Sequence, residues 1–476
     1  MNRKFLTAIV WVATMFIAVP MVAEAGWFIG PAAPSDQGKT GASVQVGGEF
    51  LARWEYQDRD FNDATSGANS NTTRIRLNTK AKIDDKTSAF IQMQSVRTDG
   101  NTNNNSSLQA NNTDASVGIH QAYLTLKDFY GTSLDLKLGR QEVVLDGHRL
   151  FGNTFWTLGG NTHDGVRLNH QHGNASLSYL YLQVVENAGG DAAADDTDES
   201  THVLYGKFKG IMGGALSLYL AAYVNNRNNT SENGTAATTT GTIDVDNDFY
   251  TIGFRQAGTL AGIKYRGEFY YQWGDADTAT ASWDRDAYLL GVRAGRNFGG
   301  SMSPTLIVWY DLVSGTSQGD VANNEVKSFD TLFDTGHKFY GYMDRFLNMG
   351  LTARGGGGAV ANDAVGGLGL HDLSIKGSIK PAPGWVARAH MHWFWTAEDA
   401  YLGAGGITAG NVGNTDLGQE LDLDLIHAYN PMTKIVFGYS HYFSGDLTDD
   451  LISSRAAGTG QGDDADWAYV MLNLKF

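Results

Sequence analysis

Beyond residue 40 the chain is dominated by alternating apolar and polar positions. In residues 72–83, for example, Arg74, Arg76 and Lys80 share one parity, whereas Ile75 and Leu77 share the other. Successive side chains of a β-strand point to opposite faces, so this pattern predicts a strand with one apolar and one cationic face. Eighteen segments of this kind predict strands at 44–57, 72–83, 88–98, 117–128, 133–142, 163–171, 175–186, 201–210, 215–225, 248–257, 261–273, 286–297, 303–312, 368–380, 385–397, 418–429, 432–444 and 465–476.

The lengths of the connections alternate as well. Gaps after even-numbered strands are short, as at 84–87 and 172–174, whereas gaps after odd-numbered strands are long and polar, as at 99–116 and 313–367. This sorting is typical of an outer-membrane barrel with short periplasmic turns and long external loops. The sequence therefore predicts an all-β fold: a transmembrane, antiparallel, up-and-down β-barrel of eighteen strands over residues 44–476. Residues 345–352 could form a nineteenth strand, but the alternation of loop lengths places them inside the longest loop.

The N-terminus has the organisation of a secretory signal. A basic start at Asn2-Arg3-Lys4 precedes an apolar stretch from Phe5 to Val22, and Ala23-Glu24-Ala25 follows. These are the three parts of a signal peptide, so we expect residues 1–25 to be removed by cleavage after Ala25. The alternative is a transmembrane anchor. Residues 26–43 would then form a short periplasmic segment before the barrel, and the mature protein would lie in a Gram-negative outer membrane.

Composition narrows the possible functions. Among 476 residues there is no Cys, which excludes disulfides, thiolate metal sites and a Cys nucleophile. The 35 basic and 51 acidic side chains give a net charge of −16, which makes nucleic acid an improbable partner. A mean hydropathy of −0.27 is compatible with a membrane barrel, because half of each barrel strand faces water.

The predicted lumen carries more cations than anions. If the apolar faces meet lipid, the opposite faces line the lumen. The inward cations are then Arg53, Arg74, Arg76, Lys80, Lys82, Lys137, Arg167, Lys207, Lys209, Lys264, Arg266, Lys376, Lys380 and Arg388, and the inward anions are Glu49, Glu55, Asp135, Glu268, Asp372, Glu420, Asp422 and Asp424. A cationic lumen lowers the energy of confined anions, so anion preference is expected. The alternative is that these charges only neutralise one another in ion pairs.

The chain ends on an alternating strand whose last residue is Phe476. A terminal aromatic on such a strand resembles the signal that barrel-assembly machinery reads, and we expect that machinery to be a partner. The alternative is a buried strand of a soluble sandwich.

Several motifs resemble the alginate-export family of outer-membrane porins. They are LGRQE at 138–142, DGHRL at 146–150, NTHDGVRL at 161–168, FDTLFDTGH at 329–337, YGYMD at 340–344, LGQELDL at 417–423 and DADWAY at 464–469. The resemblance implies an eighteen-stranded barrel that passes an anionic polyuronate through an arginine-rich constriction. It makes Arg74, Arg76, Arg140 and Arg167 candidate constriction residues and places Arg149 near the mouth. Arg140 has the parity of Leu138, so only a bulge at Gly139 would turn it inward; otherwise it lies at the rim.

The sequence thus predicts a monomeric channel in outer-membrane lipid for passive, anion-favouring passage of an anionic saccharide or polyuronate. The alternative is a less selective anion porin for small solutes. The candidate anion-binding residues are Arg53, Arg74, Arg76, Lys80, Lys137, Arg140, Arg167, Arg266 and Arg388, with Arg149 at the mouth. Loop 313–367 is long enough to gate or partly plug the lumen.

The sequence gives little support for an enzyme, a metal-binding protein or a plugged structural barrel. We find neither a G-x-S-x-G elbow nor an H-E-x-x-H zinc helix, so neither enzymatic activity nor a cofactor is predicted. His390 and His392, two residues apart, are interpreted as lumen hydrogen-bonding groups rather than metal ligands. Asp244, Asp246 and Asp248 lack the Gly and distal Glu of a calcium loop, so no metal is predicted there. A third class is an adhesion or structural barrel with a plugged lumen, but residues 26–43 are too short to plug eighteen strands.

Overall fold

A computed structural model of the chain describes most residues beyond 41. The described ranges are 42–58, 67–98, 117–185, 199–225, 248–275, 282–347, 367–400, 402–403, 406–407, 414–455 and 464–476. The predicted signal peptide, its cleavage site and the acidic run at 244–247 lie outside them. Within these ranges no helix is both long enough and apolar enough to cross a bilayer.

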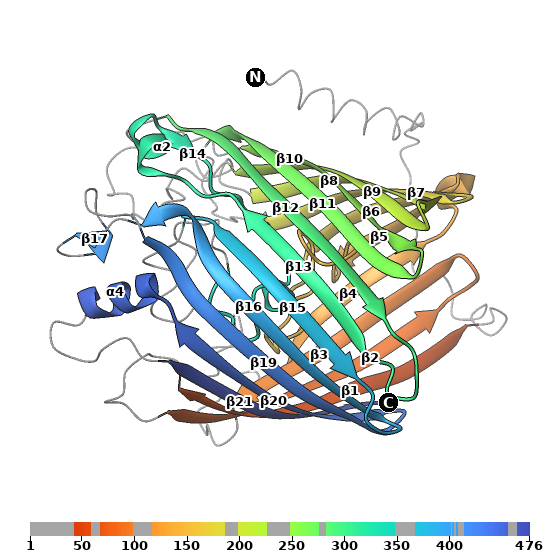
Figure 1. The fold of residues 1–476 in the computed structure, drawn as a ribbon. Coiled ribbons are helices and arrows are strands. Elements are labelled where there is room, and N and C mark those ends of the chain that lie inside the picture. Colours follow the sequence, from red (N-terminus) through yellow and green to blue (C-terminus); the bar gives the residue numbers. More distant parts are fainter. Residues whose placement is uncertain are drawn as a thin grey trace. The chain divides into compact units, whose positions relative to one another are not determined.

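One sheet, whose long strands all pair antiparallel, closes on itself to form a barrel (Figure 1). Of its nineteen strands, eighteen are long and one, β14 (Glu325–Val326), has two residues. The long strands are β1 (Ser43–Asp58), β2 (Ala68–Lys82), β3 (Thr87–Thr98), β4 (Gly118–Leu126), β5 (Leu134–Arg140), β6 (Asp164–His172), β7 (Ala175–Val185), β8 (Glu199–Ile211), β9 (Gly214–Asn225), β10 (Phe249–Leu260), β11 (Ile263–Asp275), β12 (Asp284–Asn297), β13 (Thr305–Val313), β15 (Leu370–Ile379), β16 (Trp385–Ala400), β19 (Asn414–Asn430), β20 (Thr433–Ser444) and β21 (Ala465–Lys475). Each overlaps one predicted segment, so the eighteen-stranded fold is confirmed.

The remaining elements are short and lie in connections. They are the 3₁₀ turns η2 (Phe129–Gly131) and η3 (Gly336–Lys338), the helices α2 (Gln318–Ala322) and α4 (Asp446–Arg455), and a small hairpin of β17 (Leu402–Gly403) and β18 (Gly406–Ile407). Residues 345–347 form a turn and not a strand, and the rest of the apolar segment at 345–352 lies outside the described ranges.

Alternation sorts side chains between the two surfaces of the wall. On β2, Ile75 and Leu77 are 49% and 38% exposed on the outer surface, whereas Arg74 and Arg76 are buried on the inner one. Arg74 is in register with Leu51 of β1 and with Val96 of β3. A shift of one residue would turn the arginines toward lipid, so the register is strongly specified.

The two ends of the sheet meet between β1 and β21. Phe50 pairs with Leu474, and the last residue extends the ladder, because the Gly48 amide donates to the Phe476 carbonyl at 2.8 Å and the Phe476 amide donates to the Gly48 carbonyl at 3.1 Å. A Cβ at Gly48 would lie 2.7 Å from the Arg76 carbonyl oxygen and 2.5 Å from Cζ of the Phe476 ring, so glycine allows the strands to approach closely here. The terminal aromatic is therefore part of barrel closure.

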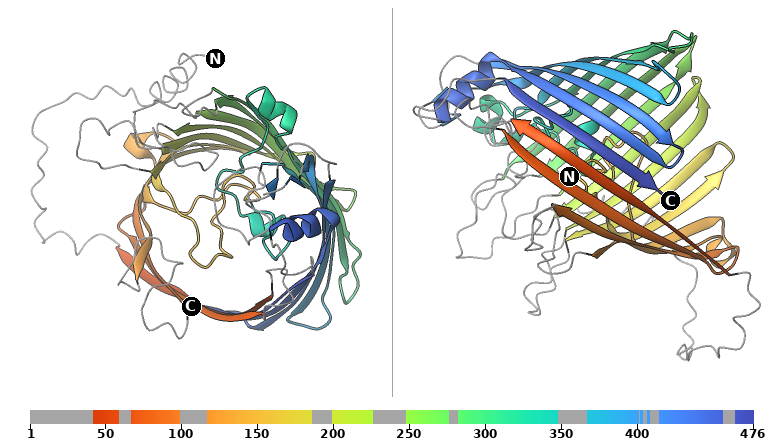
Figure 2. Two further views of the ribbon diagram at one scale, coloured as in Figure 1. Left: turned by 90° about the vertical axis from the view of Figure 1, so that its left-hand side faces the viewer. Right: turned by 90° about the horizontal axis from the view of Figure 1, so that it is seen from below.

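Two connections fold into the interior of the barrel (Figure 2). Residues 141–163 join β5 to β6, and residues 314–347 follow β13; we call them the first and second inner loops. They meet through a parallel bridge between Phe151 and Phe333. Their apolar side chains form one cluster with residues of the wall, including Val143, Leu150, Phe329, Phe339, Leu180, Val203, Tyr270 and Leu289. The long gap after the fifth predicted strand is therefore not an external loop.

The outer surface gives a direct test of the membrane assignment. Leu77→Arg should destabilise the folded barrel by about 2–4 kcal/mol if the site lies near the bilayer midplane, because it places a charge in hydrocarbon. Its neighbour Asn78, on the inner face, is the matched control, and Asn78→Arg should cost much less. Urea-dependent folding into phospholipid vesicles measures both values. Equal losses for the two variants would contradict the assignment.

Candidate functional site: two inner loops against a cationic wall

Arg149 fixes the first inner loop to the wall. Its Nε donates to Glu268 of β11 at 2.9 Å, and its Nη2 donates to both carboxylate oxygens of Asp311 of β13 at 2.7 Å. Its Nη1 donates to the Tyr340 hydroxyl at 3.0 Å, and the guanidinium lies 3.7 Å from the centre of the Phe339 ring. Arg149 is 1% exposed, so it is a buried anchor rather than a group at the mouth. One arginine thus joins both loops to two strands.

A second anchor lies three residues earlier. Asp146 accepts hydrogen bonds from Lys207 Nζ at 2.7 Å and from the Tyr219 hydroxyl at 2.6 Å. Burial alone would raise the pKa of Asp146, but hydrogen bonds from Lys207, Ser217 and Tyr219 lower it. The carboxylate therefore stays charged and neutralises cations of the wall.

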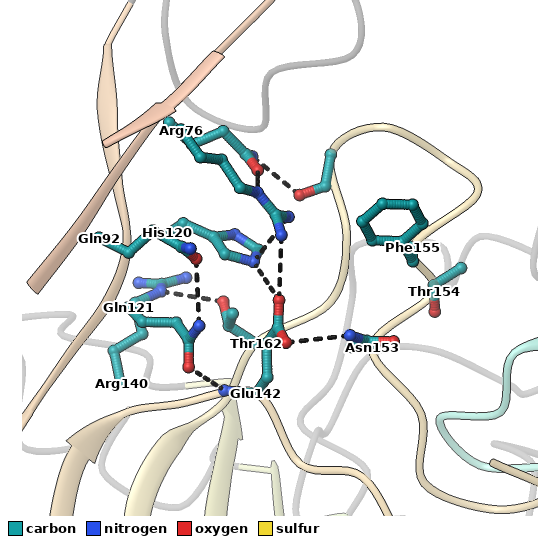
Figure 3. A network of polar contacts seen from close by, with 12 residues as sticks. Arg76, Gln92, His120, Gln121, Arg140, Glu142, Asn153, Thr154, Phe155 and Thr162 are labelled. Carbon is teal, nitrogen blue, oxygen red and sulfur yellow. Dashed lines mark hydrogen bonds and ion pairs between the residues drawn. The ribbon is translucent and has the colours of Figure 1, made fainter. Parts of the chain in front are cut away.

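Arg76 belongs to a polar network with the start of the first inner loop (Figure 3). Its Nε donates to Gln94 at 2.7 Å, and its Nη1 lies 3.3 Å from Glu142. Glu142 also lies 2.9 Å from His120 Nε2 and accepts from Asn153 Nδ2 at 2.9 Å. Although burial raises the pKa of Glu142, these partners lower it, so the loop supplies a counter-charge to the arginine.

Arg53 and Arg74 hold the next part of the same loop. Arg74 is fully buried, forms an ion pair with Glu49, and donates to the Leu158 carbonyl at 2.8 Å. Arg53 donates to the Trp156 carbonyl at 3.0 Å, and its guanidinium lies 4.2 Å from the centre of the Trp156 ring. Arg53, predicted to line the pore, and Arg74, predicted to lie at the constriction, therefore both serve as loop anchors, and the charge of Arg74 is paired.

A cluster of cations gathers where the two loops face β10, β11 and β12. Lys338 of the second loop donates to the Gly147 carbonyl of the first loop at 3.1 Å. Burial lowers the pKa of Lys338, and together with the nearby guanidinium groups of Arg266, Arg293 and Arg255 it brings this pKa to about 8. We call Arg255, Arg266, Arg293 and Lys338 the cationic cluster. Positive charge is thus concentrated at the contact between the loops.

Two predicted residues on β5 and β6, Lys137 and Arg167, are cations held by neutral groups. Lys137 lies 3.7 Å from the centre of the Tyr123 ring. Arg167 donates to the Asn169 side chain at 2.8 Å, and no carboxylate among the described residues forms an ion pair with it. Their positive charges are therefore not cancelled by a direct partner.

The remaining predicted wall residues differ in their surroundings. Lys80 is exposed on the inward parity of β2. Arg388 forms an ion pair with Asp424 at 2.6 Å, and Arg266 forms one with Glu268 at 3.2 Å. The alternative of mutual neutralisation therefore applies to part of the lumen.

Arg140 lies apart from the other predicted residues. It has the parity of the exposed Leu138, and the β4–β5 pairing runs without a register shift through Arg140, so Gly139 forms no bulge. Gly139 has φ of +119°, and a Cβ there would lie 2.4 Å from the Ala122 carbonyl oxygen. Arg140 pairs with the half-exposed Asp164 at 3.3 Å, which is the rim position rather than a lumen position.

The alternation of inward and outward positions identifies more inward-facing charges than the predicted set contained. Arg255, Arg285 and Arg293 point inward on β10 and β12, and Asp311 points inward on β13. Exposed apolar neighbours such as Ile252 and Val292 mark the outer parity of those strands, so the alternation could have identified the missing charges. Arg149 and Lys338 lie in loops, where no periodicity indicates that they fold inward.

The anchoring role of Arg149 can be tested by substitution. Arg149→Met leaves Asp311 buried without its cation, although Glu268 keeps Arg266, and the loss should cost about 3–5 kcal/mol. The first inner loop should then leave the wall, so that protease cleavage and amide exchange within 141–163 increase. Arg296→Met, at an exposed position of β12, is the control and should change neither. An unchanged exchange rate in the Arg149 variant would refute the anchor.

Comparison with known proteins agrees with this architecture. The family described as alginate export matches residues 42–353 and 355–456, whereas no curated protein matches. Solved porins share the fold at low identity: OpdK of Pseudomonas aeruginosa (11% identity, 91% of this chain and 99% of that chain, TM-score 0.50), OccAB4 of Acinetobacter baumannii (14%, 93% and 100%, 0.50) and a BenF-like porin of Pseudomonas fluorescens Pf-5 (10%, 91% and 98%, 0.51). Because the family match covers most of the closed barrel, this chain belongs to the alginate export family and is an outer-membrane channel.

Proposed function

We propose that this channel favours anions and passes an anionic saccharide or polyuronate by passive diffusion. The observation that carries the proposal is the cationic cluster of Arg255, Arg266, Arg293 and Lys338 at the contact of the inner loops. An aqueous path between low-dielectric walls focuses the field of such charges.

Local charge supports the direction of selectivity. Four arginines act on Lys338: Arg149, Arg255, Arg266 and Arg293. The carboxylates that pair with these arginines are Asp146, Glu268 and Asp311, so the four arginines and Lys338 exceed their three paired carboxylates by two. The lowered pKa of Lys338 is a second sign of that surplus, because neighbouring cations contribute to it.

The choice of a saccharide acid rests on chemistry and on the family. Arginine binds carboxylates through a planar fork of donors, which suits uronic acids better than a point charge would. The family description names the export of alginate, which is a polymer of uronic acids. Lys80, Lys137 and Arg167 would extend the path as cations along the wall. We further expect a monomer whose assembly uses the strand that ends at Phe476.

The second candidate is a less selective anion porin for small solutes. Ion pairs such as Arg74–Glu49 and Arg388–Asp424 favour it, because they remove several arginines from direct solute binding. Block of chloride current by short oligouronates separates the two candidates: a saccharide channel is blocked, whereas a general porin conducts chloride with little change.

Reversal potentials in planar bilayers under a KCl gradient test the anion preference. Arg293→Gln combined with Lys338→Gln should lower the chloride-to-potassium permeability ratio by roughly a factor of three, because two charges of the cationic cluster are lost. Arg74→Ala and Arg76→Ala should have smaller effects, since Glu49 and Glu142 pair with these arginines. Arg296→Gln is the control. Cation preference of the unmodified channel would overturn the proposal.

The selectivity should also depend on pH. Lys338, with a pKa of about 8, is mostly protonated at pH 7 and mostly neutral at pH 9. Raising the pH through this range removes positive charge, so the anion preference should fall. Lys338→Met should abolish that part of the pH dependence while leaving a constant, lower selectivity. An identical pH profile in the variant would assign the titration to another group.

A further inference from the structure

Two histidines and a carboxylate converge on the inner face of the wall, away from the cationic cluster. His390 and His392 share the inward parity of β16, and Asp422 of β19 is directly opposite His390 in the register. One donor atom from each of the three side chains lies within 4.8 Å of the other two. His392 and Asp422 are fully buried, with exposures of 0% and 1%.

Asp372 of β15 orients the His392 ring. Its two oxygens lie 2.8 and 3.1 Å from His392 Nδ1, which therefore donates to the carboxylate. The lone pair of a neutral ring is then on Nε2, which is buried and has no hydrogen-bond partner in the described part of the chain. A carboxylate behind an imidazole is the usual support of a metal-ligating histidine.

Asp422 presents a second unsatisfied atom to the same point. Its Oδ1 accepts from the Ser440 hydroxyl at 2.6 Å, whereas Oδ2 is buried and unpartnered within the described ranges. Oδ2 lies 3.8 Å from His392 Nε2, which is too long for a hydrogen bond. His390 Nδ1 is also buried and unpartnered there. Facing lone pairs without a shared cation are unfavourable, because buried acceptors lose their solvation without compensation.

We propose that His390, His392 and Asp422 form a binding site for a divalent transition-metal ion, for which Zn²⁺ is the first candidate. Zn²⁺ takes imidazole nitrogen and carboxylate oxygen at about 2.0–2.2 Å, so tetrahedral ligand atoms lie roughly 3.4 Å apart. The 3.8 Å separation of His392 Nε2 and Asp422 Oδ2 needs only a small inward shift to reach that value. Two imidazoles disfavour Ca²⁺ and Mg²⁺, which prefer oxygen.

Two cations, Lys376 and Arg388, neighbour the proposed site. Lys376 is opposite His390 in the register and its charge acts on Asp372 and Asp422, but its Nζ lies 4.5 Å from the centre of the Trp309 ring. Arg388 is paired with Asp424 at 2.6 Å. No ion pair in the described part of the chain joins either cation to Asp422, so its Oδ2 remains available to a metal ion.

The site lies beside the second inner loop. The Tyr342 ring is 5.2 Å from the His390 ring, and Glu420, opposite His392, accepts from the Met343 amide at 2.9 Å. Bound metal would therefore fix the wall strands on which this part of the loop rests. Amide exchange within 336–347 should slow when the metal is added.

Metal binding can be measured on the full-length protein in detergent after treatment with a chelator. We expect one Zn²⁺ per chain by calorimetry and by elemental analysis, and a visible absorption spectrum typical of four-coordinate Co²⁺ when Co²⁺ replaces it. His392→Gln and Asp422→Asn should each weaken binding at least tenfold, and Asp372→Asn should weaken it by roughly 10- to 100-fold. Heat-modifiable migration on gels verifies that each variant still forms the barrel.

The matched control is the pair His170 and His172 on β6, which has the same spacing but lies at the surface, with ring centres 6.5 Å apart. The double variant with Gln at both positions should retain binding at full affinity. The proposal is overturned if micromolar Zn²⁺ does not bind, which would mean that a proton alone bridges His392 and Asp422. Binding that survives His392→Gln, or that is lost only in the control, also overturns it.

Discussion

The structure depends most on a buried guanidinium that binds two carboxylates of the wall. Arg149 forms ion pairs with Glu268 and Asp311, and both carboxylates are at most 1% exposed. Removing the arginine would leave buried negative charge without this partner, which is destabilising. This constraint keeps the first inner loop inside the barrel, and through Tyr340 it also fixes the second loop. Arg149 lies next to the bridge between Phe151 and Phe333, so it positions the apolar contact of the two loops against the wall.

Once the loop is fixed, it distributes charge unequally around the lumen. Toward β2 it contributes Glu142, which pairs with Arg76, and its backbone carbonyls accept from Arg53 and Arg74. Toward β10–β12 it contributes Asp146, but there the second loop adds Lys338 to the arginines of the wall. The same inward fold therefore neutralises one side and concentrates positive charge on the other, which a count of wall residues alone does not reveal.

Alternation and loop length were sufficient to predict the eighteen strands, because lipid outside and water inside impose opposite requirements on neighbouring residues. The same rule could have located Arg255 and Arg293, whose neighbours Ile252 and Val292 are exposed and apolar. It could not locate the role of Arg149, since its partners lie 119 and 162 residues away. Nor could it show that Gly139 leaves the ladder unbroken, which keeps Arg140 at the rim.

The two histidine pairs show that spacing in the sequence does not identify a binding site by itself, because the strand register decides which residues lie nearby. His170–His172 and His390–His392 have identical spacing on strands, and nothing local in the sequence distinguishes them. What differs is the neighbouring strand: β19 brings Asp422 opposite His390, and β15 brings Asp372 to the other side of His392. A site in a barrel wall is therefore formed by residues of neighbouring strands, and it can be identified only when the register of three strands is known. The same register places Glu420 opposite His392, and Glu420 accepts a hydrogen bond from the Met343 amide, so the strand pair that carries the histidines also holds the second inner loop.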